Sequence, residues 1–227
     1  MRSGGRKGDD VTPASPAQLP PAQVPPLQVP PLQVPLAQGF FARSALDVAR
    51  DLIGCTFLFG GAGGRIVETE AYRQDDPCCH GYRGKTARNA VLFGPPGHLY
   101  VYFTYGMHFC ANTVCEEDGV AAGVLLRALE PDHEAEVMSA RRGVTEPRLI
   151  ASGPARLAQA LGVAREQNGL PVWEPPLAIL PRPAGARRPK IVATARIGVR
   201  GGDQKPWRFA AADSRFLSRP LPRGARR

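Results

Sequence analysis

The feature of this sequence that most constrains its fold is a series of strand-like runs joined by short turns. The runs are 55–59 with 65–72, 99–104 with 107–114, and 120–129. Strands joined by so few residues pair antiparallel, because a parallel crossover needs roughly a dozen residues or more. Helix signals fall between groups of strands, which is typical of α+β proteins. We therefore expect one α+β domain with a curved, largely antiparallel sheet and flanking helices.

Three segments have helix signals, with a capping residue or a stopping glycine at their ends: 44–54, 132–142 and 152–162. The hydroxyl groups of Ser44 and Ser152 can cap the first and the third, and Pro154 fits the first turn of the third. Two runs near the end, 190–199 and 207–211, are predicted strands.

The ends of the chain differ in composition from the middle. Residues 1–39 hold nine prolines and a repeated Val-Pro-Pro-Leu-Gln unit, and a segment of this kind has too few large apolar side chains to form a core. We expect a disordered tail over 1–39, a folded domain over 40–220 and a short basic tail over 221–227.

The distribution of charge indicates the kind of partner. The 227 residues have a formal net charge of +9, but residues 182–227 contain 13 Lys and Arg against Asp203 and Asp213, a surplus of +11. A basic segment that also contains aromatic residues favours nucleic acid over a membrane, since no basic amphipathic helix is evident. A basic tail that only aids solubility is the alternative.

No sequence signal indicates a membrane-spanning or secreted protein. No apolar run approaches the roughly 18 residues of a membrane span, and no cationic start precedes an apolar segment. The five cysteines, an odd number, cannot form a closed disulfide framework. We expect an intracellular protein in a reducing compartment.

Two carboxylates in the run 65–72 share one face, because alternation along a strand places Ile66, Glu68, Glu70 and Tyr72 together. A carboxylate in a cleft can act as a general base on water, and paired carboxylates flank the scissile bond in most glycosidases. Neighbours at i and i+2 point in parallel about 7 Å apart, however. Exposed charges on a solvated strand face are therefore the ordinary explanation.

Tyr105 occupies the bend between the runs 99–104 and 107–114, where small polar residues are usual. A rigid side chain at such a tip can fill the gap that a base leaves when it flips out of a duplex. The alternative is that this ring folds back onto the core. Tyr100 and Tyr102 share a strand face and can form either core or a stacking wall.

Arg127 lies in an otherwise apolar run, so its guanidinium needs a partner, for which Glu68, Glu70 and Glu130 are candidates. The partner can equally be structural or part of a substrate site.

Anion and metal sites give weaker signals. Residues 152–154 open a predicted helix without an acid in its first turn, so its free N–H groups can hold a phosphate. The Cys and His residues between positions 78 and 115 lack the spacing of a zinc site, and no phosphate-binding loop of the Gly-x4-Gly-Lys type occurs. We expect no metal and no cofactor.

Several motifs together closely resemble the alkyladenine (3-methyladenine) DNA glycosylase family, in order and in spacing. They are Ile66-Val-Glu-Thr-Glu-Ala-Tyr72, His80, Arg83-Gly-Lys-Thr-Ala-Arg-Asn89, Gly97-His-Leu-Tyr-Val-Tyr-Phe-Thr-Tyr-Gly-Met-His-Phe-Cys-Ala-Asn112, Val124-Leu-Leu-Arg-Ala-Leu-Glu-Pro131 and Ser152-Gly-Pro154. The resemblance extends from about residue 43 to residue 220. It implies a monofunctional, metal-free DNA repair enzyme that flips a damaged purine, alkylated or deaminated, out of duplex DNA and hydrolyses its N-glycosidic bond. It also implies a monomer located with the DNA.

The resemblance assigns roles to individual residues. Glu70 matches the general base that activates water, Tyr105 matches the intercalating residue, and Glu68 is expected to be paired and structural. The predicted base pocket contains Tyr72, His80, Tyr102, Asn112 and Arg127. Within it, Asn112 is expected to disfavour guanine through its exocyclic amine. The predicted contacts to the DNA backbone are Lys85, Arg88, Ser152 and Gly153.

The sequence departs from the family pattern at Cys78 and Cys79, at His108, and in the acidic run 116–118. Two rival functions are a non-catalytic nucleic-acid binder, which predicts no carboxylate at position 70, and a carbohydrate hydrolase, which predicts indifference to salt.

Overall fold

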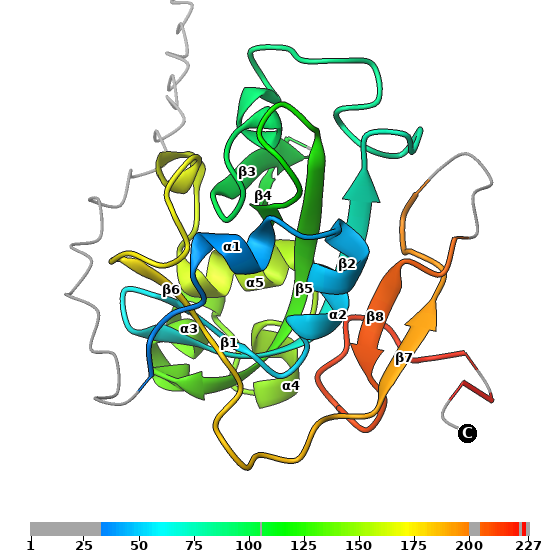
Figure 1. Ribbon diagram of the computed structural model, residues 1–227. Helices are drawn as coiled ribbons and strands as arrows, with labels where there is room; N and C mark the ends of the chain where they lie inside the picture. Colours follow the sequence, from blue (N-terminus) through cyan, green and yellow to red (C-terminus); the bar gives the residue numbers. More distant parts are fainter. Residues whose placement is uncertain (1–32, 105, 200–204, 223, 226–227) are drawn as a thin grey trace, which may run out of the picture.

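The computed structural model describes residues 33–104, 106–199, 205–222 and 224–225. Its strands form one sheet in the order β3-β4-β5-β2-β1-β6, and β8 pairs with both β2 and β7. Among the described residues every strand pair is antiparallel. The expected α+β fold with a curved antiparallel sheet is confirmed (Figure 1).

The elements in chain order are α1 (Gln38–Phe41), α2 (Ala45–Asp51), β1 (Thr56–Phe59), β2 (Ala62–Arg73), the 3-10 helix η1 (Ala90–Phe93), β3 (Leu99–Thr104), β4 (His108–Val114), β5 (Ala122–His133), α3 (Ala135–Arg142), α4 (Pro147–Ile150), α5 (Pro154–Leu161), the 3-10 helix η2 (Arg165–Gln167), β6 (Leu177–Leu180), β7 (Ile191–Thr194) and β8 (Arg208–Ala211). The described part of the chain contains no helix long and apolar enough to cross a bilayer.

Alternation along the strands separates the core from a cavity. On β5, Val124 and Leu126 belong to the main hydrophobic core, whereas Leu125 and Arg127 line a cavity. Helix α2 packs on β2 and β5, and α5 packs on β4 and β5, with their buried side chains in the same core (Figure 1). One face of the sheet is thus used for packing, and the other face is left for a site.

Helix α2 follows its sequence signals. The Ser44 hydroxyl accepts a hydrogen bond from Leu46 N at 3.3 Å, as expected of a cap. Val48 and Ala49 are buried, and the carbonyl of Ala49 accepts a hydrogen bond from the Thr69 hydroxyl at 2.8 Å, which ties the helix to β2.

The turn between β1 and β2 is shorter than predicted. Gly60 and Gly61 have φ angles of 57° and 84°, the left-handed values of a two-residue hairpin turn. Gly63 and Gly64 belong to β2, where a Cβ would lie 2.0 Å from Phe57 O and 2.1 Å from Glu130 O. These glycines permit close backbone approach, a role that the sequence alone does not distinguish from a turn.

Several predicted boundaries are wrong. Strand β5 continues to His133, so the following helix begins at Ala135 and not at residue 132. The predicted strand 190–199 is confined to β7. Ser152 does not cap α5: the N-cap is Gly153, and the Ser152 hydroxyl instead accepts a hydrogen bond from Arg156 Nη1 at 3.2 Å.

Five short elements, α1, η1, α4, η2 and β6, were not predicted. Residues 177–180 form an edge strand on β1, although prolines flank this short apolar run. Strand β2 also departs from simple alternation, because register shifts flank Glu68 in its pairing with β5, and Ile66 packs into the main core beside Val67.

Candidate active site

A cavity of about 400 Å³ lies on the open face of the sheet, between strands β2 to β5 and the segment that follows β7. All five residues of the predicted base pocket line it: Tyr72, His80, Tyr102, Asn112 and Arg127. Four of them lie on the strands β2, β3, β4 and β5, and His80 lies in the loop that follows β2. The folding of the sheet is therefore what brings these residues together.

One wall of the cavity is aromatic. The rings of His80 and Tyr102 are 4.4 Å apart between centroids, and those of Tyr100 and Tyr102 are 5.6 Å apart. His80 Nδ1 lies 3.0 Å from the Tyr100 hydroxyl. Desolvation by the neighbouring rings, aided by the positive charge of Arg88, lowers the pKa of His80 and favours the neutral imidazole. The Tyr102 ring is inclined by 36° to that of Tyr100 and by 70° to that of His80, so the wall offers uncharged aromatic faces and edges to a ligand.

A hydrogen bond to the neighbouring strand β3 orients the amide of Asn112 on β4. Its Nδ2 donates a hydrogen bond to Tyr100 O at 3.1 Å, and its side chain is 6% exposed. An amide held in this way presents a fixed pattern of donors and acceptors to a ligand in the cavity.

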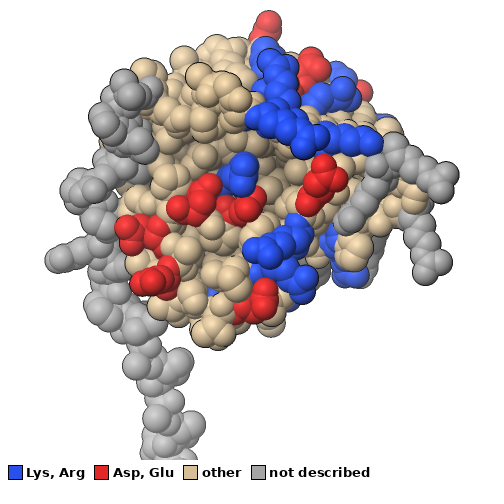
Figure 2. Space-filling model, turned by 90° about the horizontal axis from the view of Figure 1, so that it is seen from below, with Lys and Arg blue, Asp and Glu red and all other residues tan. Residues whose placement is uncertain are grey.

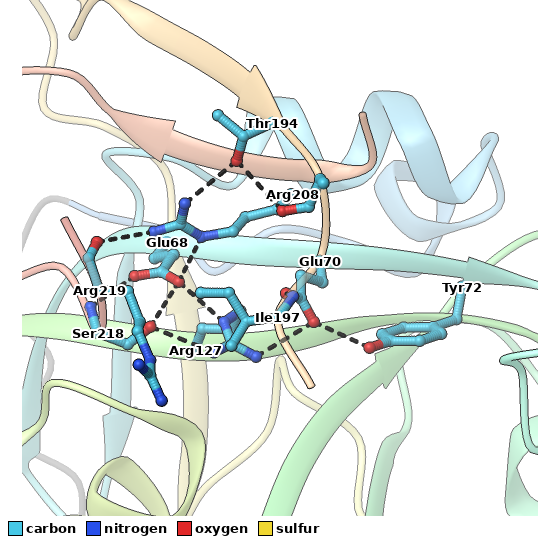
Figure 3. A network of polar contacts seen from close by, with 10 residues as sticks. Glu68, Glu70, Tyr72, Arg127, Thr194, Ile197, Arg208, Ser218 and Arg219 are labelled. Carbon is cyan, nitrogen blue, oxygen red and sulfur yellow. Dashed lines mark hydrogen bonds and ion pairs between the residues drawn. The ribbon is translucent and has the colours of Figure 1, made fainter. Parts of the chain in front are cut away.

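Glu70 is fully buried directly behind this cavity, with Tyr72, Arg127 and Ile197 between its carboxylate and the open space. Its Oε1 accepts a hydrogen bond from Ile197 N at 2.7 Å, and its Oε2 accepts from the Tyr72 hydroxyl at 2.8 Å and from Arg127 Nη1 at 3.1 Å (Figure 3). Burial raises the pKa of Glu70 above its ordinary value, more than the charge of Arg127 and these hydrogen bonds lower it, and the nearby charge of Glu68 adds to the increase. The carboxyl is thus poised for proton uptake.

Glu68, two residues away, has different surroundings. Its Oε1 accepts from Arg127 Nε and Arg208 Nε, both at 2.8 Å, and the backbone and hydroxyl of Ser218 donate to its two oxygens at 2.6 and 2.7 Å (Figure 3). Burial alone would raise the pKa of Glu68, but the hydrogen bonds and charges of the two arginines outweigh burial, and the pKa is lowered. The expectation that Glu68 is paired is confirmed, and the alternative of exposed charges on this strand is wrong.

Arg127 therefore has two carboxylate partners, Glu68 and Glu70, from the three that the sequence offered. The third, Glu130, pairs instead with Arg65 at 2.7 Å.

The Tyr72 ring packs against a guanidinium, that of Arg196, a contact that was not predicted from the sequence. The guanidinium of Arg196 lies 4.6 Å from the centre of the Tyr72 ring and 5.2 Å from that of Trp207, and it forms a buried ion pair with Asp76. Among the described residues, Nε and Nη2 of Arg196 have no hydrogen-bond partner, and the two ring faces provide a favourable cation–π contact to the buried guanidinium. The tyrosine ring is thereby held in place from outside the cavity.

Asn89 holds the loop that carries His80. Its Nδ2 donates to His80 O at 2.8 Å and to Gly84 O at 3.1 Å, and its Oδ1 accepts from Thr86. Asn89 belongs to a motif noted in the sequence, but only the structure shows what its side chain does.

The predicted contacts to the DNA backbone lie in two places. Lys85 and Arg88 are exposed, and Arg88 Nη2 donates to Phe103 O at 3.2 Å, near the end of β3. Ser152 and Gly153 precede Pro154, which lines the cavity. Ser152 is 8% exposed, and its hydroxyl faces the exposed Arg156.

The predicted intercalating residue, Tyr105, lies outside the described residues. Beside it, Met107 is 69% exposed and Phe103 is 37% exposed, so large apolar side chains reach solvent at this end of the hairpin. His108 is half-buried.

The remaining departures from the family pattern also have positions in the structure. Cys78, Cys79 and Cys110 line the cavity. The described residues contain no group of three or more His, Cys, Asp or Glu side chains that could hold a metal ion. Glu116 is directed to the start of α2, where its Oε1 accepts a hydrogen bond from Ala45 N at 3.2 Å.

Comparison with known proteins gives the same picture. The family model described as methylpurine-DNA glycosylase (MPG) matches residues 39–215. Proteins named "Putative 3-methyladenine DNA glycosylase" from Rhodopseudomonas palustris strain CGA009 and Rhizobium meliloti are 55% and 49% identical over 188 and 181 residues. These alignments cover 83% and 79% of this chain and 90% and 94% of the relatives.

The residues that form the cavity and the buried carboxylates all lie within the matched range. The chain therefore belongs to the methylpurine-DNA glycosylase family of DNA repair enzymes, and the predicted enzyme class, a DNA glycosylase, is confirmed.

Proposed function

We propose that this protein excises alkylated or deaminated purines from duplex DNA, as a monomer and without a cofactor, with water as the nucleophile. The observation that carries the proposal is a buried, hydrogen-bonded carboxylate, Glu70, directly behind an aromatic cavity in a protein of this family. Such a protein acts wherever the DNA of its cell is located.

The damaged base, such as 3-methyladenine, 7-methylguanine or hypoxanthine, is flipped out of the stack and enters the cavity between Tyr72, His80 and Tyr102. Aromatic faces attract a base that alkylation has made cationic. The fixed amide of Asn112 disfavours the exocyclic amine of guanine. The pocket therefore selects against an undamaged base, and the weaker glycosidic bond of an alkylated base adds to this selectivity.

Water reaches the carboxylate of Glu70 between Tyr72, Arg127 and Ile197 once the nucleotide is bound. The water oxygen forms the new bond to the sugar C1′, its proton passes to Glu70, and the electron pair of the N-glycosidic bond leaves with the base. Arg127 and the Ile197 N–H support the ionised form that this step requires.

Outside the pocket, Tyr105 fills the gap in the duplex, and Lys85, Arg88, Ser152 and Gly153 contact the backbone. The exposed side chains of Phe103 and Met107 support the view that this hairpin meets the minor groove.

The decisive experiment is to incubate the protein with duplexes that each hold one modified purine and to measure abasic-site formation in single turnovers. We expect cleavable abasic sites from at least one alkylated purine and none from undamaged DNA. Tight binding without base release would favour the non-catalytic binder, and release of reducing sugars from oligosaccharides would favour the carbohydrate hydrolase.

A further inference from the structure

Ser218, in the segment that follows β8, reaches the centre of the carboxylate network from a distant part of the sequence. Its backbone N–H and its hydroxyl donate to the two oxygens of Glu68 at 2.6 and 2.7 Å. The same hydroxyl oxygen accepts a hydrogen bond from Arg127 Nη2 at 3.2 Å (Figure 3). The hydroxyl is therefore used as donor and as acceptor at once, which alanine cannot reproduce.

These contacts fix the plane of the Arg127 guanidinium. Its Nε is held by Glu68 and its Nη2 by Ser218, and the remaining terminal nitrogen, Nη1, is left directed at Glu70, 3.1 Å from Oε2. Because the guanidinium is planar, fixing two of its nitrogens determines where the third points.

The segment that carries Ser218 is itself anchored. Phe216 is 6% exposed and packs in the main core. Arg208 Nη2 donates to Arg219 O at 3.0 Å on the other side. Ser218 is thus held between two anchors in a defined position.

We propose that Ser218 is a positioning residue for the excision reaction: its hydroxyl fixes Arg127 in the orientation in which that arginine holds the carboxylate of Glu70. The inference rests on the proposed function, because it assigns Glu70 the role of general base.

Removal of the hydroxyl has a specific consequence. Arg127 Nη2 loses its acceptor and Glu68 loses a donor, so the guanidinium is free to turn toward Glu68 and away from Glu70. The titratable and charged groups around Glu70 are Glu68 and Tyr72 on β2, Tyr102 on β3, Arg127 on β5 and Arg208 on β8. Ser218 touches Glu68 and Arg127 among them, so its loss reaches Glu70 through Arg127.

The test compares Ser218→Ala, Ser218→Thr and Ser214→Ala in single-turnover excision between about pH 4.5 and pH 9. Ser214 lies in the same segment, but its hydroxyl contacts the Phe216 N–H and not the network. In Ser218→Ala we expect the acid limb of the rate to move to higher pH, with about a tenfold loss on that limb for each unit of movement. Ser218→Thr keeps the hydroxyl and should restore the limb, and Ser214→Ala should match the unaltered protein.

An unchanged acid limb in Ser218→Ala would overturn the proposal, including the case in which the variant only melts at lower temperature. If Ser218→Ala does not fold, Ser218→Cys is measured in the same way, since its thiol is a weak donor and acceptor. A titration of ¹³C-labelled glutamate side chains by NMR, with Glu70→Gln to assign the signal, gives a readout without DNA. If the protein releases no modified purine, the proposed function fails, whereas the shift of the Glu70 titration in Ser218→Ala still decides the positioning role.

Discussion

Two glutamates on β2, Glu68 and Glu70, have pKa values that their surroundings shift in opposite directions. Both are fully buried, but Glu68 faces two arginines and Ser218, whereas Glu70 shares one arginine with it. The pKa of Glu68 is lowered and that of Glu70 is raised. Carboxyls whose environments separate their pKa values are typical of an acid–base site, with one group structural and the other exchanging protons.

We predict that Glu70→Gln abolishes base release and leaves lesion binding nearly intact, because the amide keeps the shape of the side chain but cannot take a proton from water. The expected loss in the single-turnover rate is about 10²- to 10⁴-fold. In the unaltered protein the rate should fall as the pH drops through the raised pKa of Glu70, above the ordinary value of 4.5.

Glu130→Gln is the matched control, because this carboxylate pairs with Arg65 away from the cavity lining. Near-normal excision by Glu70→Gln, or an equal loss in both variants, would exclude Glu70 as the base.

We predict that Glu68→Gln mainly costs stability, by about 3 kcal/mol at neutral pH, because it removes the carboxylate paired with buried Arg208 and one of the two paired with Arg127. The folded-state pKa of Glu68 is lower than its ordinary value of 4.5, so its stabilising contribution is present above that value and is lost as the pH falls through the folded-state pKa. Urea denaturation at neutral pH and in mild acid measures both effects. The variant should lose less stability on acidification than the unaltered protein, and equal losses would contradict the assignment.

At the scale of elements, local signals predicted structure where local interactions determine it. The cap of α2, the two hairpins and the long strands β2 and β5 follow from periodicity and turn residues. Alternation on β3 also predicted that Tyr100 and Tyr102 share a face, and both line the cavity. The predictions failed where contacts between distant segments determine the secondary structure. The edge strand β6 forms because it pairs with β1, and β5 extends to His133 because it pairs with β2.

In the candidate site, too, some residues were predicted from the sequence, whereas those that act through distant contacts were not. Five of the residues that line the cavity were predicted through the family resemblance, whereas Arg196, Arg208 and Ser218 were not assigned roles in the site. These three act through contacts with β2 and β5, more than 50 residues away in the sequence, and no local pattern indicates where their side chains point.

We predict that Ser44→Ala lowers the free energy of unfolding by about 1 kcal/mol, because α2 loses the side-chain acceptor for Leu46 N. The α2 residues pack on β2, so the loss should appear in global unfolding, measured by thermal melting or urea. Ser152→Ala should leave the cap of α5 unaffected, because Gly153 is the N-cap there. A fall in helix content near α5 in that variant would restore the role predicted from the sequence.

For the whole molecule, the net charge of +9 is not spread as a uniform field. Figure 2, which views the molecule from below, shows Lys and Arg interspersed with Asp and Glu on that face. The exposed Lys85 and Arg88 belong by contrast to the segment between β2 and β3, which carries His80 of the cavity, and Arg88 Nη2 donates to Phe103 O on β3. We therefore expect DNA binding to depend more on where the exposed Lys and Arg side chains lie than on the net charge of the protein.

We predict that binding to undamaged duplex DNA weakens steeply with salt and that Lys85→Ala and Arg88→Ala each reduce the slope of log Kd against log salt by about 1, since each removed phosphate contact releases fewer counterions. Arg148→Ala, on α4 at the lower end of the molecule and paired with Glu146, should leave the slope unchanged. Fluorescence anisotropy over a salt series measures the slopes. A dissociation constant that is flat with salt would exclude phosphate contacts as the source of affinity.

The thiols around the cavity have a chemical consequence for the proposed excision of alkylated bases. Burial raises the pKa of Cys79 to about 11 and also raises that of Cys110, although hydrogen bonds oppose the effect at both. The thiolate is the reactive form of cysteine, so these side chains stay protonated and are poor nucleophiles at neutral pH. Cys79 and Cys110 can thus line the cavity and remain poorly reactive toward methyl donors.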